Sequence, residues 1–194
     1  MILLPADREE DLVEGLRNRN DAVMRDFYLT YYRYLAATAM LYVSDQQDLQ
    51  DLMQDVFIKI FTRINRFSYR GHGSLQAWIH KIAVNESLRF LQAKKKQSHY
   101  PIERFDRQED DEEDIPLGLS IDDIPQDDLL EMIRSLPDRY RMVFNLFVFE
   151  NKSHKEIGAL LKIKEDTSAS NLHRARALLN KWIIRYREER KHGK

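Results

Sequence analysis

Acidic side chains recur at helical spacing in the segment 48–61. Asp48, Asp51 and Asp55 occupy positions i, i+3 and i+7, so a helix here would carry three carboxylates along one face, with Gln54 beside them. No histidine or further acid converges on this face at the spacing of a metal site. The stripe is therefore either an ordinary solvated helix face or a docking site for an arginine-rich helix of a partner protein.

The segment 74–96 offers the opposite charge. Lys81, Asn85 and Arg89 repeat every four residues, and three consecutive lysines, 94–96, end the segment. Cationic side chains along one face suit a nucleic-acid backbone, and the Asn85 amide can both donate to and accept from a base. A turn-forming sequence with two glycines precedes the segment, and Ser74 is placed to cap the helix. A generic helix face is the alternative, which the scarcity of acids here weakens.

A short helix, a brief turn and a longer helix are expected between residues 153 and 187. Ser153 and Glu156 have the spacing of a capping box, and the longer helix begins at Glu165. This order is typical of a helix-turn-helix, whose second helix enters the major groove of DNA. The side chains expected to face DNA are Ser170, Asn171, His173 and Arg174, with Arg176 and Lys181 towards phosphate. The pattern alone leaves a plain helical hairpin open.

Charge alternates in blocks along the 194 residues. Residues 1–55 carry eleven acids and five bases, residues 56–96 nine bases and one acid, and residues 97–128 twelve acids and two bases; residues 151–194 have a net charge of +7. The basic blocks are candidates for polyanion binding, and the acidic blocks for a basic protein surface. There is no cysteine, and no apolar run is long enough to span a bilayer. These features favour a cytoplasmic protein.

Helical periodicity recurs throughout the chain, and no segment alternates for long with the period of a strand. Helices are expected at 7–18, 21–42, 45–66, 74–95, 127–135, 138–149, 153–161 and 165–187. The acidic run 108–114 lies between the two groups of helices and offers little apolar surface. The predicted fold is all-α, with two small helical domains, 1–96 and 127–194, joined by an acidic flexible linker, 97–126.

Three other functions compete with nucleic-acid recognition by a two-domain factor. An enzyme is not expected, because the sequence contains no glycine-rich phosphate loop, paired histidine ligands or nucleophile–base set. We likewise expect no cofactor, metal or small-molecule substrate. A transcription regulator with a helix-turn-helix effector domain and a helical sensing domain would explain the second domain, but not the acidic and basic stripes of the first. A helical scaffold protein is opposed only by the charge blocks.

Three segments together resemble the extracytoplasmic-function (ECF) group of bacterial sigma factors. The sequence from Asp48 to Phe57 is similar to the region 2 helix that docks on the polymerase clamp. The sequence from Ser74 to Asn85 is similar to the segment that captures the −10 element. Leu136 to Arg141, with Glu156-Ile157 and residues 174–176, resembles region 4, which reads the −35 element. The order of the three segments, more than any one of them, is specific.

This resemblance implies a function, partners and residue roles. The chain would direct core RNA polymerase to promoter DNA, with contacts at the clamp and flap, and an anti-sigma factor, often membrane-anchored in this group, would hold it inactive. The residues implied in polymerase binding are Asp48, Asp51, Gln54 and Asp55. Those implied at the −10 element, with the loop 68–73 holding a flipped base, are Tyr69, Arg70, His72, Lys81, Asn85, Arg89, Lys94, Lys95 and Lys96. Those implied at the −35 element are Lys164, Thr167, Ser170, Asn171, His173, Arg174 and Arg176.

The chain departs from the family pattern around the turn of the helix-turn-helix. The family usually has a glycine near position 162, a capping serine or threonine near 164 and a valine at 168, where this chain has Lys162, Lys164 and Ser168. Ala169 and Asn171 stand where the family often has basic residues. We expect these differences to alter or weaken −35 recognition without changing the fold.

Overall fold

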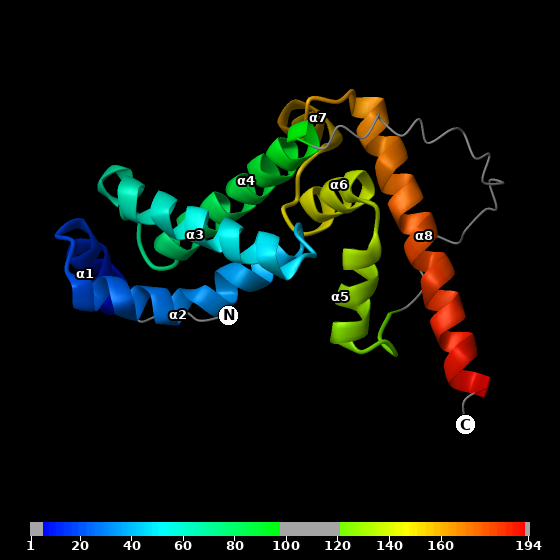
Figure 1. Cartoon of the computed structure of the whole chain (residues 1–194), viewed down its shortest axis with the longest axis horizontal. Coiled ribbons are helices and arrows are strands. Elements are labelled where there is room, and N and C mark those ends of the chain that lie inside the picture. The colour runs from blue at the N-terminus through cyan, green and yellow to red at the C-terminus, as the bar shows by residue number, and fades with distance from the viewer. Residues whose placement is uncertain (1–5, 98–120, 193–194) are drawn as a thin grey trace. The chain divides into compact units, whose positions relative to one another are not determined.

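The computed structural model describes residues 6–97 and 121–192, and the side chains of residues 9–94 and 121–191. Within these ranges the chain forms eight α-helices and one 3-10 turn, with no strand (Figure 1). The helices fall into two compact units, Met1–Gln97 and Ser98–Lys194. The all-α prediction is confirmed, and all eight expected helices are present. Most of the predicted linker lies outside the described residues.

The first unit consists of α1 (Ala6–Arg17), α2 (Asp21–Met40), α3 (Gln46–Arg63), the 3-10 turn η1 (Ile64–Arg66) and α4 (Ser74–Gln97). Helices α2, α3 and α4 pack against one another in pairs, and α1 packs on α2 and η1. The core lies where the apolar stripes of these helices meet, and aromatic rings fill one end of it. Its fully buried members include Phe27, Leu35, Leu52, Val56, Ile60, Leu75 and Ile79.

Side-chain caps fix the starts of two of these helices. The Asn20 Oδ1 atom accepts N–H bonds from residues 22 and 23, and Asp45 Oδ1 accepts those of residues 47 and 48. Each cap satisfies backbone donors that have no partner inside the helix. The bonds from Asp48 and Gln47 hold the pKa of the Asp45 carboxyl below its ordinary value. The sequence thus sets the starts of α2 and α3 locally.

The second unit consists of α5 (Gln126–Ser135), α6 (Asp138–Val148), α7 (His154–Leu161) and α8 (Glu165–His192). Helix α8 packs against the other three helices of the unit. One cluster of this core joins α5, α6 and α8 through Ile133, Leu136, Tyr140, Ala175 and Leu179. The predicted capping box at the start of α7 is present, with the Ser153 and Glu156 side chains bonded reciprocally to backbone N–H groups. Helix α8 ends five residues beyond its predicted end.

The residues just before α5 are held by contacts within the second unit. Ile124 is buried at 7% exposure, and the Arg187 guanidinium donates two hydrogen bonds to the Asp123 carboxylate, at 2.9 and 2.6 Å. This pairing holds the pKa of the Asp123 carboxyl below its ordinary value. The C-terminal part of α8 therefore fixes the residues that lead into α5.

The turn of the helix-turn-helix holds Lys162 in the left-handed conformation. Its φ is 57° and ψ is 45°, and its N–H donates to the Gly158 carbonyl as the C-cap of α7. Glycine is the usual residue at such a position because it has no Cβ to clash. A Cβ at Gly158 would lie 2.8 Å from the Ile163 carbonyl oxygen, so the turn also requires a glycine one helical turn earlier. Lys162, where the family usually has glycine, thus keeps the left-handed backbone conformation that suits glycine, at the cost of local strain.

Replacing Lys162 by glycine is expected to stabilise the protein. Because an L-residue in the left-handed region costs about 1 kcal/mol, the Lys162→Gly variant should gain about that free energy of unfolding. The same substitution at Lys181, exposed in the interior of α8, should lose about 1 kcal/mol. Guanidinium denaturation of the two variants measures both changes. Equal signs for the two would contradict the role of the left-handed conformation.

Candidate protein and nucleic-acid interfaces

The acidic stripe of α3 divides into an exposed and a paired part. Asp51, Gln54 and Asp55 are exposed to solvent, as the sequence predicts. Asp48 is less exposed, and its carboxylate forms an ion pair with Lys94 of α4. Two residues that the sequence assigns to different partners therefore contact each other. The exposed part of the stripe is centred on Asp51 and Asp55.

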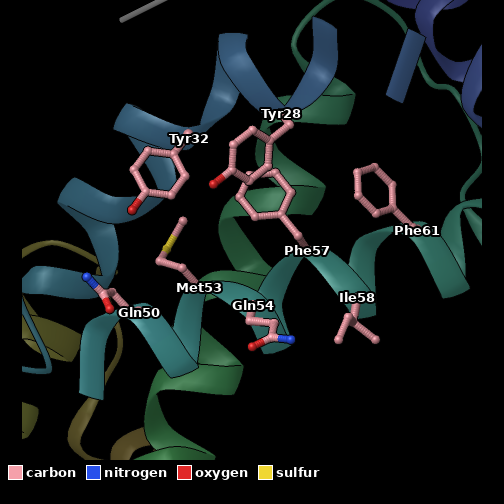
Figure 2. A pocket seen from close by; sticks show the side chains of 8 residues that line it. All are labelled: Tyr28, Tyr32, Gln50, Met53, Gln54, Phe57, Ile58 and Phe61. Atoms are coloured by element: carbon pink, nitrogen blue, oxygen red, sulfur yellow. The ribbon is translucent and has the colours of Figure 1, made fainter. Parts of the chain in front are cut away.

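An apolar groove lies beside the acidic stripe, between α2 and α3 (Figure 2). Its volume is about 520 Å³. Tyr28 and Ile58 remain 42% and 52% exposed at its surface, and the Tyr28 ring packs on Phe57 with 4.6 Å between centroids. The lining residues are Tyr28, Tyr32, Gln50, Met53, Gln54, Phe57, Ile58 and Phe61. Gln54 thus belongs to both the groove and the acidic stripe, so the two form one surface with an apolar centre and an acidic edge.

The polar stripe of α4 is on the surface, as predicted. Lys81, Asn85 and Arg89 are exposed. Glu86 lies next to this stripe and pairs with Arg89 at 3.2 Å and with Lys59 of α3 at 3.6 Å. Because the Arg89 side chain is 65% exposed, this pair is screened by water and leaves the guanidinium accessible. The side chains of the predicted contacts Lys95 and Lys96 lie outside the described residues.

The loop before α4 is held by residues far away in the sequence. Both of its glycines adopt positive φ, 99° at Gly71 and 83° at Gly73. The Gly73 and Leu75 N–H groups each donate to one carboxylate oxygen of Glu9, at 2.6 Å. The Ser74 hydroxyl instead accepts the Arg70 N–H, at 3.2 Å. The prediction that Ser74 caps α4 is therefore wrong, because a buried carboxylate of α1 takes that place.

Three of the side chains predicted at the −10 element belong to this loop. Arg70 and His72 are exposed, and Tyr69 is half-buried. The loop lies in sequence directly before α4, which carries Lys81 and Asn85 on its surface. Phe67 at the base of the loop packs against Trp78 of α4, with 5.1 Å between the ring centroids. This contact joins the start of the loop to the first turns of the helix.

The start of α8 carries most of the predicted DNA contacts on its exposed side. The exposed members are Lys164, Thr167, Ser170, His173 and Arg174, and Arg176 is half-buried. Asn171 is an exception, since it is buried at 8% exposure. It lies on the same helix face as Ser168, Leu172 and Ala175, which pack towards the other helices. The expectation that the Asn171 side chain is exposed for a DNA contact is therefore wrong.

Ser168 takes part in a network that joins α7 to α8. The Ser168 hydroxyl is fully buried and lies 3.0 Å from Nδ1 of His154, the first residue of α7. The His154 ring stacks on the Phe147 ring, with 4.9 Å between the centroids. The Arg176 guanidinium lies over the same Phe147 ring, 5.6 Å from its centroid. A hydrogen bond thus takes the place of the apolar contact that a valine would make at 168.

Comparison with protein families accounts for both units. The family model of Sigma-70 region 2 matches residues 27–97, and that of Sigma-70, region 4 matches residues 126–179. The two matches fall on the two structural units, in the order of the family. The chain belongs to the sigma-70 family. Its relatives place it in the ECF group, so this sigma factor directs RNA polymerase to promoters.

Several curated relatives resemble this sigma factor over nearly their whole length. The RNA polymerase sigma-H factor of Pseudomonas aeruginosa is 25% identical over 186 residues, which cover 92% of this chain and 95% of the relative. The ECF sigma-E factors of Haemophilus influenzae and Escherichia coli K12 are 24% and 25% identical, over 90% and 89% of this chain and 95% and 92% of the relatives.

Solved structures of sigma factors are also similar. The sigma factor RpoE of Bartonella quintana, solved with the anti-sigma factor NepR, matches with a TM-score of 0.46 and 20% identity, over 82% of this chain and 96% of that one. CnrH, solved with the cytosolic domain of CnrY, matches with a TM-score of 0.45 and 16% identity, over 89% and 95%.

The family matches do not cover the whole of the described structure. Helix α1 and the first residues of α2 precede the region 2 match, which begins at residue 27. Residues 180–192 of α8 follow the region 4 match, which ends at residue 179. Within the described residues, no helix is both long and apolar enough to cross a membrane. The exposed stripes of α3, α4 and α8 all lie inside the matched regions.

Proposed function

We propose that the three exposed surfaces of this sigma factor bind core polymerase, the −10 element and the −35 element. The surface around Asp51, Gln54 and Asp55, with the adjacent apolar groove, docks on the polymerase clamp. An apolar centre with a charged edge supports this role, because burial gives affinity while the carboxylates select and orient a basic partner. The groove beside the acidic stripe is the observation that carries the proposal.

In the first unit, the loop 68–73 and α4 capture the single-stranded −10 element. An extruded base needs a polar pocket that recovers the few kcal/mol of unstacking. The loop and the exposed Asn85 amide supply hydrogen-bonding groups at its edge, and Lys81, Arg89 and the lysines that follow neutralise phosphates. In the second unit, the exposed start of α8 enters the major groove at the −35 element, with Arg174 as the base-reading residue.

Run-off transcription tests this proposal. Purified core polymerase would be combined with the full-length protein and the DNA upstream of its own gene. A discrete transcript that depends on the protein is expected, and it would locate the promoter at the same time. Titration of labelled protein with core polymerase decides the competing function, a helix-turn-helix regulator. Absence of both the transcript and core binding would refute the proposed sigma function.

Replacing Asn85 by alanine should impair strand opening selectively. We expect opening to fall about tenfold while closed-complex formation is unchanged, because the amide contacts only the extruded base. Fluorescence of 2-aminopurine in the −10 element measures opening, and gel-shift at low temperature measures the closed complex. Asn65→Ala, at another exposed asparagine of the same unit, serves as the control. An equal decrease in both steps would count against base capture.

An anti-sigma protein is a further proposed partner. The resemblance to the ECF group supports it, since sigma factors of this group are commonly held inactive in this way. The protein would act in the cytoplasm as a non-catalytic regulator of transcription. Co-purification of the tagged full chain from its own cells tests the proposed partner, because a stoichiometric protein that prevents core binding is the expected result.

A further inference from the structure

Helix α1 contacts both ends of the loop proposed to capture the −10 base. At the entry, Arg17 Nη2 donates to the Phe67 carbonyl oxygen at 2.5 Å. At the exit, the two oxygens of the Glu9 carboxylate accept the Gly73 and Leu75 N–H groups, each at 2.6 Å. Eight residues of helix span about 12 Å, so one rigid element holds the two ends at a fixed separation. The region 2 family match begins at residue 27 and does not include this helix.

The Glu9 carboxylate supplies hydrogen-bond acceptors for the backbone N–H groups of Gly73 and Leu75, at the start of α4. The first N–H groups of a helix have no partner within it, and here the Ser74 hydroxyl accepts the Arg70 N–H. Glu9 is 2% exposed, and its negative charge lies at the positive end of the α4 dipole. Each of its oxygens accepts one donor, which a carboxylate can do and an amide cannot. The charge and both oxygens of this side chain are therefore used.

The loop needs such restraint because its conformation is unusual. Gly71 and Gly73 adopt φ of 99° and 83°. Glycine populates negative φ about as readily, so an unrestrained loop would leave this conformation easily. A Cβ at either glycine would meet no atom within 4 Å, so side-chain packing does not hold these residues. The backbone bonds to Glu9 and Arg17 thus do what packing does elsewhere in the unit.

Helix α1 is itself fixed to the core. Val13 and Leu16 are each 2% exposed, and a Cβ at Gly15 would come within 2.8 Å of the Val23 methyl groups of α2. Movement of α1 relative to α2 is therefore sterically restricted. The polar contacts of Glu9 and Arg17 transmit this fixed position to the loop.

We infer that Glu9 and Arg17 are positioning residues, which pre-organise the loop 68–73 for single-stranded −10 DNA. The inference rests on the proposed function of that loop. A loop already held in its bound conformation loses less entropy when DNA binds, and this raises affinity without any contact between α1 and DNA. The acidic helix does not touch nucleic acid, and removal of its carboxylate weakens DNA binding.

The experiment compares Glu9→Gln with Glu10→Gln, which removes the adjacent exposed carboxylate of the same helix. Each full-length variant would be assembled with core polymerase and titrated with a fluorescein-labelled non-template −10 oligonucleotide. We expect Glu9→Gln to raise the Kd about tenfold, the loss of one charge-assisted hydrogen bond, and Glu10→Gln to leave it unchanged. Arg17→Gln removes the second contact and should weaken binding in the same direction.

Two further measurements separate positioning from a general structural role. Core-polymerase affinity and helicity should be unchanged in Glu9→Gln, while amide exchange accelerates at Gly73 and Leu75. Unchanged oligonucleotide binding, or parallel loss of core binding and helicity, would overturn the inference. Failure of the wild-type holoenzyme to bind the oligonucleotide would instead refute the proposed function of the loop and the inference with it. If Glu9→Gln does not fold, the Arg17→Gln titration decides by the same criteria.

Discussion

Replacing Asp51 and Asp55 together by lysine should abolish binding to core polymerase. Both carboxylates are exposed on one face of α3, beside the apolar groove. An ion pair at 4 Å in a water-like dielectric is worth about 1 kcal/mol, and reversal turns each attraction into a repulsion. The two changes amount to about 4 kcal/mol, or roughly a thousandfold in Kd. Asp48 is left unchanged because it already pairs with Lys94.

The binding titration should be repeated at two salt concentrations, because screening must reduce the wild-type affinity if the carboxylates contribute to it. The control variant carries lysine at Asp11 and Glu14, two exposed acids of α1, and has the same net charge. It should bind core polymerase normally. Equal loss of binding in both variants would show a non-specific charge effect, and tight binding by the Asp51/Asp55 variant would refute the docking surface. Circular dichroism should show the same helicity in all three proteins.

Local sequence patterns predict the helices of this sigma factor well. The starts of α2 and α3 follow side-chain caps, and the start of α7 follows a capping box between Ser153 and Glu156, which acts over three residues. The apolar periodicity also identifies the buried faces of α2, α3 and α4. These features depend on residues close in sequence, so the sequence alone specifies them.

The faces of α8 were harder to predict for a physical reason. A helix that packs against three others buries a wide arc, and Asn171 and Ser168 fall inside it although both are polar. The Ser168 hydroxyl finds a partner in His154, fourteen residues earlier. A polar residue buried with a partner from another helix has no signature in local periodicity. The expectation that Asn171 lies on the exposed side of the helix is therefore wrong.

Contacts between distant helices account for the other features that the sequence does not predict. Glu9 meets residues 73 and 75 across more than sixty positions, and Asp48 meets Lys94 across forty-six. Tyr28 and Ile58 form part of a groove only because α2 and α3 pack with these faces adjacent and uncovered. In a single sequence the charged members look like ordinary surface residues, and the apolar members look like ordinary core residues. Only the tertiary structure brings them together.

Arg174→Ala should weaken binding at the −35 element by about 1–3 kcal/mol, which corresponds to a loss of roughly five- to 150-fold. Arg174 is exposed near the start of α8, where a helix-turn-helix places its base contacts, and arginine binds guanine through two hydrogen bonds. The loss should be confined to one base pair of the element. Titration of the holoenzyme with the promoter mapped by run-off transcription, and with variants of its −35 element, measures it.

Arg174→Lys distinguishes base reading from a phosphate contact. Lysine keeps the charge but lacks the planar pair of donors, so a base contact should be lost in both variants, whereas a phosphate contact should survive in the lysine variant. A phosphate contact would also make the alanine loss uniform across sequences and lower the salt slope by about one. Arg185→Ala is the matched control, since Arg185 lies on the same face about 16 Å further along α8 and pairs with Glu189. Because this control removes the same charge outside the recognition end, an equal loss there would refute the assignment of Arg174 to the −35 element.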